Sequence, residues 1–114
     1  MQIEKSHLGG SVTRLKLAGR LDINGSAMVE IPIALAAKNC RVLLIDMSEV
    51  SYVASLGVRH LVMAAKTLSW GGGKLVLFAV TEPVAETLET MGITDLIPLA
   101  ASESAALGLA GTTA

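Results

Sequence analysis

A serine, a histidine and an aspartate, the residue types of a hydrolytic triad, occur in this sequence as Ser55, His60 and either Asp46 or Asp22. In a serine hydrolase the histidine must reach the serine hydroxyl to act as its base. An apolar repeat typical of a helix begins at Ser55, so His60 would lie about 140° around the helix axis from it. Ser55 also lacks the Gly-x-Ser-x-Gly elbow of many hydrolases. We therefore do not expect an enzyme.

Two further patterns resemble sites that bind or accept a phosphate. Gly71-Gly72-Gly73-Lys74 has the composition of a phosphate loop, but it leads into an apolar strand pattern and not into a helix N-terminus that would hold phosphate. Asp46 ends a buried strand, like the phosphoacceptor of a receiver domain. Such a domain needs a lysine after its last strand, whereas Leu99 is followed here by Ala100. We interpret the glycines as a turn and do not expect a receiver domain.

Size and charge limit the classes of partner. The chain has 114 residues, the usual size of one domain, and no linker-like stretch divides it. The net charge is -1 and the Lys and Arg residues are scattered, which does not fit a nucleic-acid binder or a polybasic membrane surface. We expect one domain over residues 1–114 that does not bind nucleic acid.

The cysteine and histidine content argues against a disulfide and against a metal. Cys40 is the only cysteine, and His7 and His60 stand far apart in the sequence. No cofactor or metal is expected. The N-terminus lacks a signal-peptide pattern, and no apolar run approaches the ~18 residues that span a bilayer. We expect a cytoplasmic protein without membrane insertion.

The sequence opens with a predicted hairpin. Residues 3–8 and 12–17 alternate weakly in polarity, and Gly9-Gly10 lies between them. Two alternating runs around such a turn are typical of antiparallel strands.

A helix up to about Asn39 should follow. Met28, Ile31 and Leu35 recur at helical spacing after a polar trio that begins at Asn24 and offers capping groups. Pro32 lies inside this pattern, where a proline typically costs ~3 kcal/mol, so the helix either kinks or begins nearer Ile31.

A central strand and a second helix come next. Residues 42–45 are apolar without alternation, as in a strand covered on both faces, and this strand should end at Asp46. After Ser55, an apolar face of helical spacing should lie on the sheet until the glycines at 71–73 end the helix. Its members are Val58, Leu61, Val62, Ala65 and Leu68.

The last third predicts two more strands and two more helices. We expect a strand over residues 74–80, a helix from Glu82-Pro83 to Gly92, a short strand over 97–99, and a helix over 102–109 capped by Ser102. Residues 110–114 should form a frayed tail. Strands separated by helices pair in parallel. The predicted fold is therefore α/β, with a mixed sheet, an opening antiparallel hairpin and about four helices.

Ser55 has two interpretations. As the residue before an apolar-periodic run, it is placed to be an N-cap whose hydroxyl accepts a backbone N–H bond, typically worth ~1 kcal/mol. The same position suits a phosphate, because a helix N-terminus offers unpaired N–H groups and a partial positive charge. A phosphate of about -1.5 to -2 charges would repel a partner that had packed there, while the fold persists.

The order of motifs resembles the STAS domain family, named for sulfate transporters and anti-sigma factor antagonists. The resemblance rests on Gly19-Arg20-Leu21-Asp22, on residues 42–59 and on the Met91-Gly92-Ile93 helix exit, and it covers nearly the whole chain. It implies a bacterial antagonist that binds an anti-sigma factor, and that is phosphorylated by the same protein acting as a serine kinase. The residue that matches the phosphorylated serine is Ser55. The family's antagonists usually carry Asp-Ser-Ser/Thr-Gly here, where this chain has Ala54-Ser55-Leu56-Gly57.

The predicted partner surface includes a stripe of the second helix. Arg59, Met63, Lys66 and Trp70 are spaced to share one face, on which methionine and tryptophan favour contact and the cations suit an acidic partner. The resemblance also places the loop of Asp22 and Asn24 near the serine, although Asn24 is equally well explained as a helix cap. The partner-binding residues that we predict are Asp22, Asn24, Tyr52, Ala54, Leu56, Gly57, Arg59, Met63 and Lys66.

Two other functions stay open. The chain could be a stand-alone scaffold subunit of a lipid-transport ATPase or of a sensory complex, with Ser55 only as a cap. A small hydrolase or nucleotide-binding enzyme is the third class. The alanine-rich surface also leaves homodimer formation open.

Overall fold

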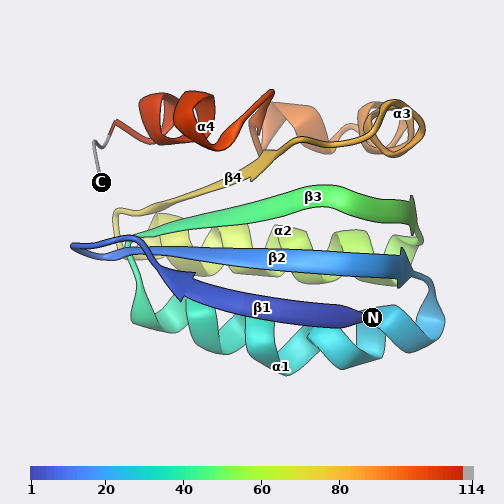
Figure 1. Cartoon of the computed structure of the whole chain (residues 1–114), viewed down its shortest axis with the longest axis horizontal. Helices are drawn as coiled ribbons and strands as arrows, with labels where there is room; N and C mark the ends of the chain where they lie inside the picture. Colours follow the sequence, from blue (N-terminus) through green and yellow to red (C-terminus); the bar gives the residue numbers. More distant parts are fainter. Residues whose placement is uncertain (112–114) are drawn as a thin grey trace.

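Within residues 1–111, which the computed structural model describes, five strands form one sheet in the order β1-β2-β3-β4-β5 (Figure 1). Only the β1–β2 pair is antiparallel, and the other three pairs are parallel. The elements are β1 (Gln2–His7), β2 (Val12–Leu21), α1 (Ile23–Asn39), β3 (Val42–Val53), α2 (Ser55–Trp70), β4 (Lys74–Phe78), α3 (Glu82–Thr90), the 3-10 turn η1 (Ile93–Asp95), β5 (Leu99–Ala100) and α4 (Glu103–Leu109). The predicted α/β fold with a mixed sheet and four helices is confirmed.

Helices cover both faces of the sheet. In Figure 1 the α1 and α2 helices lie together on one side of the strands, and α4 lies on the other. The larger buried cluster joins the sheet to α1, α2 and α3, and includes Leu15, Ile45, Leu61 and Leu88. A smaller cluster lies beneath α4 around Ala106, against Leu44, Val76 and Phe78. The strand β3 is therefore covered on both faces, as its unbroken apolar run predicts.

The strand β3 is longer than the sequence indicates. We expected it to end at Asp46, but it pairs with β2 as far as Leu21 and Val53. Two register shifts, one after Lys16 and one after Gly19, each give β3 one residue more than β2. The buried side chains of this half of the strand are Met47, Val50 and Val53. Their three-residue spacing hides a strand from a search for two-residue alternation.

The helix α1 differs from its prediction in the face that it buries. It is a single helix from Ile23 that continues through Pro32, so of the two alternatives left open by Pro32 the later start near Ile31 is wrong. Its inward residues are Gly25, Ser26, Val29, Ile33, Ala36 and Ala37. The apolar residues that predicted the helix, Met28, Ile31 and Leu35, are all exposed. The donor that Pro32 lacks would have bonded the carbonyl of Met28, on the solvent side, where water can replace it.

The C-terminal elements follow the prediction closely. The Ser102 hydroxyl accepts a bond from the Ala105 backbone N–H, as expected of a cap of α4. The strands β4 and β5 are shorter than predicted, and β5 begins only at Leu99. In the predicted frayed tail, Ala110 caps the C-terminus of α4 and Gly111 follows in a turn. Residues 112–114 lie outside the described residues.

Candidate functional site

The turn that leads into α1 and the turn that leads into α2 lie side by side. They follow neighbouring parallel strands, and the last residue pair of these strands is Leu21 with Val53. The Ala54 backbone N–H donates to the Leu21 carbonyl over 2.8 Å and ties one turn to the other. Carboxyl ends of parallel strands meet at one edge of a sheet, which is where α/β proteins usually place their sites. Ser55 thus begins its helix beside Asp22.

The cap of α1 is Asp22 and not Asn24. An Asp22 carboxylate oxygen accepts the Gly25 backbone N–H over 2.9 Å. Asn24 is the second residue of the helix and is exposed. The interpretation of Asn24 as a cap is therefore wrong, and its side chain is free to face a partner.

Removing the cap should lower stability measurably. Asp22→Ala is expected to lower the free energy of unfolding by about 1 kcal/mol, because one N–H at the start of α1 loses its acceptor. Asn24→Ala should change it by less than about 0.5 kcal/mol, as for an ordinary surface residue. Urea unfolding followed by circular dichroism measures both. Equal losses in the two variants would contradict the assignment of the cap.

Gly57 determines how closely α2 approaches α1 and the end of β2. A Cβ on Gly57 would lie 3.0 Å from the Ser26 hydroxyl and 3.2 Å from the Leu21 Cβ. Gly57 and Ser26 are both buried, and Ser26 donates to the Leu21 carbonyl over 3.3 Å. Although the sequence predicts Gly57 as part of the partner surface, the structure gives it an internal position. It supports the surface by letting α2 start close to α1.

Ser55 is the first residue of α2, and Ala54 occupies the N-cap position. The interpretation of Ser55 as the capping residue is therefore wrong. No side chain caps this helix, and its first turn contains no acidic residue. The Ser55 side chain is exposed, so its hydroxyl is accessible next to the uncapped start of the helix. Backbone N–H groups there retain the capacity to bind an anion.

A shallow pocket of about 410 Å³ adjoins Ser55. It is lined by Arg20, Asp22, Ile23, Asn24, Tyr52 and Ala54, so the turn after β2 and the end of β3 both contribute. The Arg20 guanidinium lies 4.5 Å from the centre of the Tyr52 ring, a cation–π contact that holds the ring in place. Four of the predicted partner residues meet here.

Sequence reasoning missed Arg20 and Ile23 as members of this pocket. Ile23 is 74% exposed, more than any other large aliphatic side chain of the described residues. A signal was present, since Ile23 does not share a helical face with the buried Val29 and Ile33. Arg20 gives no comparable signal, because its contact with Tyr52 depends on strand pairing.

The predicted stripe of α2 faces solvent. Arg59, Met63, Lys66 and Trp70 are all exposed, with Trp70 at 84% and Met63 at 56%. Leu56 extends this surface toward Ser55. The predicted partner residues thus form a surface that runs from the pocket along α2, with Gly57 beneath it.

Of the residues considered for catalysis, Asp22 caps α1 beside Ser55, whereas His60 and Asp46 have other surroundings. His60 lies in a groove between α1 and α2 together with Glu30, Lys38 and Met63. The Asp46 carboxylate accepts the Ser48 backbone N–H over 2.9 Å. Residues 1–111 contain no group of three His, Cys, Asp or Glu side chains suited to a metal ion.

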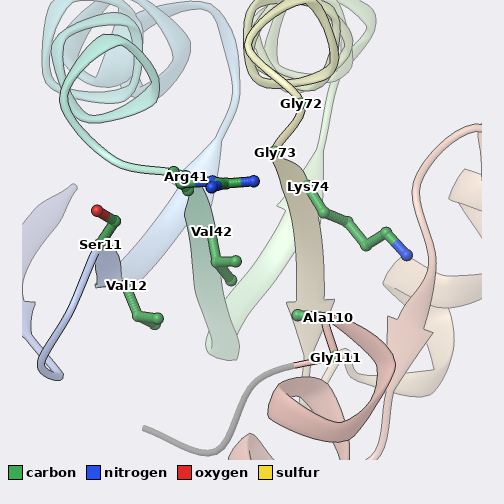
Figure 2. A pocket seen from close by; sticks show the side chains of 9 residues that line it. All are labelled: Ser11, Val12, Arg41, Val42, Gly72, Gly73, Lys74, Ala110 and Gly111. Carbon is green, nitrogen blue, oxygen red and sulfur yellow. The ribbon is translucent and has the colours of Figure 1, made fainter.

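Another pocket, of about 440 Å³, lies at the opposite end of the sheet (Figure 2). Arg41 and Lys74 line it, beside the glycine turn that follows α2. The helices α1, α2 and α4 all end next to it, and Lys74 donates to the Leu109 carbonyl over 3.3 Å. Cations at helix C-termini are stabilised by the partial negative charge there. The bond of Lys74 to the end of α4 fits that role.

Residues 3–106 match the STAS domain family. The anti-sigma F factor antagonist of Paenibacillus polymyxa is 27% identical over 109 residues, which cover 94% of this chain and 92% of that protein. The putative anti-sigma factor antagonist BtrV of Bordetella bronchiseptica is 31% identical over 87 residues, which cover 74% of this chain and 75% of that protein. None of the helices described is both long and apolar enough to cross a membrane.

The fold is similar to that of the anti-sigma factor antagonist SpoIIAA. Its unphosphorylated form superimposes with a TM-score of 0.81 at 16% identity, covering 99% of this chain and 100% of that one. Its phosphorylated form superimposes with a TM-score of 0.73 at 15% identity, covering 95% of this chain and 98% of that one. At such identities the likeness shows a shared fold.

Proposed function

Because the chain belongs to the STAS domain family and groups with its anti-sigma factor antagonists, we propose that it binds an anti-sigma factor that is also a serine kinase, and that phosphorylation of Ser55 ends this binding. Proteins of this group regulate by binding, not by catalysis. The observation that carries the proposal is the exposed Ser55 at the first position of an uncapped helix. We expect this function in the cytoplasm.

A phosphate on Ser55 would add charge without disturbing the fold. The side chain projects from the start of α2, where backbone N–H groups and the helix dipole favour an anion. Neither a capping bond nor a buried contact of Ser55 has to break, because Ala54 is the N-cap and the serine is exposed. The solved phosphorylated form of SpoIIAA, a protein of the same fold, supports such a state.

The same phosphate would weaken a partner bound over Ser55. The surroundings of the serine are largely apolar, with Leu56 on one side and the half-buried Ala54 on the other. A partner that packs on them would have to desolvate about -1.5 to -2 added charges. The exposed Arg59 and Lys66 further along α2 suit an acidic partner surface and would steer its approach.

A labelling experiment tests the phosphoacceptor. Incubation with the cognate anti-sigma factor kinase and ATP is expected to add one phosphoryl group, located on Ser55 by mass spectrometry of peptides. Ser55→Ala should remain unlabelled. Ser51→Ala, which changes another exposed serine near the end of β3, should be labelled like the unaltered chain. Undiminished labelling of Ser55→Ala would contradict the proposal.

The apolar neighbours of Ser55 favour one alternative, a scaffold subunit of a lipid-transport ATPase or of a sensory complex with permanent contacts. Ala54 and Leu56 replace the acid and the hydroxyl usual at this loop, so the surface suits a constant contact. The affinity for the partner distinguishes this alternative. A scaffold subunit should bind its partner tightly, and Ser55→Asp should leave that affinity unchanged.

A further inference from the structure

A cavity of about 380 Å³ lies where α2 ends and β4 begins. This cavity, the Trp70 pocket, has a lining that includes Lys66, Trp70, Lys74, Leu75, Leu96 and Pro98. Two of its apolar side chains are open to solvent, since Trp70 is 84% exposed and Leu96 is 51% exposed. Exposed apolar side chains that gather at one place usually mark an interface. Tryptophan in particular is enriched among the residues that dominate binding energy.

The charged residues of the Trp70 pocket are both cations. Lys66 and Lys74 are exposed, and no lining residue within 1–111 is acidic. Lys66 takes part in none of the ion pairs of these residues. Figure 2 shows the Lys74 side chain extending away from Arg41, and its ammonium donates to the Leu109 carbonyl, which leaves two N–H donors for another acceptor. An acidic occupant complements these charges, whereas a second copy of the same pocket would be repelled.

The edge of β4 at Leu75 has no strand beside it. The strand β5 pairs with β4 only at Leu77 and Phe78. Alternate residues of a strand direct their N–H and C=O groups to the same side, so those of Leu75 point the same way as those of Leu77, whose N–H bonds the Pro98 carbonyl. Pro98 itself has no N–H to give to the Leu75 carbonyl. An occupant with main-chain polar groups of its own, a peptide segment, suits such an edge.

We propose that the Trp70 pocket binds an extended acidic segment of the anti-sigma factor. A large apolar side chain of this segment packs between Trp70 and Leu96, and its carboxylates lie near Lys66 and Lys74. The inference rests on the proposed function for the identity of the partner, and it adds a second contact to the one at Ser55. The pocket is continuous with the exposed stripe of α2, of which Lys66 and Trp70 are members.

The pocket and Ser55 are far enough apart to act separately. Trp70 is 15 residues beyond Ser55 on α2, which corresponds to about 22 Å along the helix axis. An interface of standard size covers about 800 Å² of each partner and extends over such a distance. The pocket therefore holds the kinase on the chain but does not contact the phosphoryl group that is transferred to Ser55.

The indole ring of Trp70 allows a direct test in the whole chain. Trp70 is its only tryptophan, so incorporated 5-fluorotryptophan gives a single fluorine NMR signal from the pocket. Unlabelled anti-sigma factor is expected to move this signal and to reduce its H₂O/D₂O solvent isotope shift several-fold, because the ring leaves the water. A signal whose position and isotope shift stay unchanged when binding is saturated would overturn the inference.

Two variants test the apolar and the acidic parts of the occupant. Trp70→Ala should weaken binding of the anti-sigma factor about tenfold and raise the KM of Ser55 phosphorylation by a similar factor, with kcat unchanged. Lys66→Glu should weaken binding several-fold. Lys5→Glu makes the same change of net charge on β1, at the far edge of the sheet, and should have little effect. All three side chains are exposed, so the unfolding midpoint should stay constant.

The outcomes separate this inference from the proposed function. Binding by the wild-type chain with undiminished affinity in Trp70→Ala would overturn the inference and leave the proposed function intact. Equal losses in Lys66→Glu and Lys5→Glu would indicate an effect of net charge and would overturn the acidic segment. Failure of the wild-type chain to bind the anti-sigma factor would remove the proposed function, and the inference with it.

Discussion

Replacing Gly25 by alanine is expected to lower the free energy of unfolding by about 3 kcal/mol, a large part of the stability of a small domain. A Cβ at this position would lie 2.0 Å from the Arg20 carbonyl oxygen. That oxygen belongs to the backbone, so it cannot move aside as a flexible side chain would. The end of β2 and the start of α1 would have to separate, and the pocket next to Ser55 would open with them.

Gly108→Ala is the matched control. Gly108 lies within α4, and nothing stands within 4 Å of the Cβ that alanine would add. Alanine there should raise stability by up to about 1 kcal/mol, because glycine is the poorer helix former. Urea unfolding of both variants measures the difference. A Gly25→Ala protein as stable as the wild type would show that α1 does not need this close approach.

Ser55→Asp is expected to weaken binding of the anti-sigma factor by at least about tenfold, which corresponds to 1.4 kcal/mol. The carboxylate places a negative charge on the surface where the partner must pack, with less charge than a phosphate. Stability should be unchanged or slightly higher, because an acidic side chain suits the first turn of a helix. Isothermal titration calorimetry gives the affinity, and thermal unfolding checks the fold.

Ser104→Asp provides the comparison for this prediction. Ser104 is also exposed in the first turn of a helix, but α4 lies on the other face of the sheet. The variant carries the same added charge in the first turn of a helix and should bind like the wild type. Equal loss of affinity in the two variants would indicate a general effect of net charge and not a contact at Ser55.

Local pattern was sufficient to predict most elements, and it failed where position depends on neighbouring strands. The helix α2 was predictable because Val58, Leu61 and Leu68 keep one helical face that the sheet buries. The second half of β3 was not, since its bulges arise from pairing with β2. The buried face of α1 was also hidden, because close approach to the sheet selects small residues such as Ala36 and leaves the large ones outside.

In the candidate site too, residues placed by one helix were predictable and residues placed by strand pairing were not. Ser55 and the exposed stripe with Met63 and Trp70 follow from spacing along one helix. The contact of Arg20 with Tyr52 joins residues 32 positions apart and needs the strand register. The cap of α1 was misplaced by two residues, because Asp22 and Asn24 are both good capping residues and only the backbone decides between them.

The two bulges of β3 bear on how chains of this fold tolerate insertions and deletions. A bulge absorbs an extra residue without changing which side chains face the core, but it bends and twists its strand. Deleting the exposed Ser48 or Ser51 would therefore leave Met47, Val50 and Val53 inward. The straightened strand would present Ala54 and Ser55 at a different angle. Length changes in this stretch offer a route by which partner preference can diverge while the core is conserved.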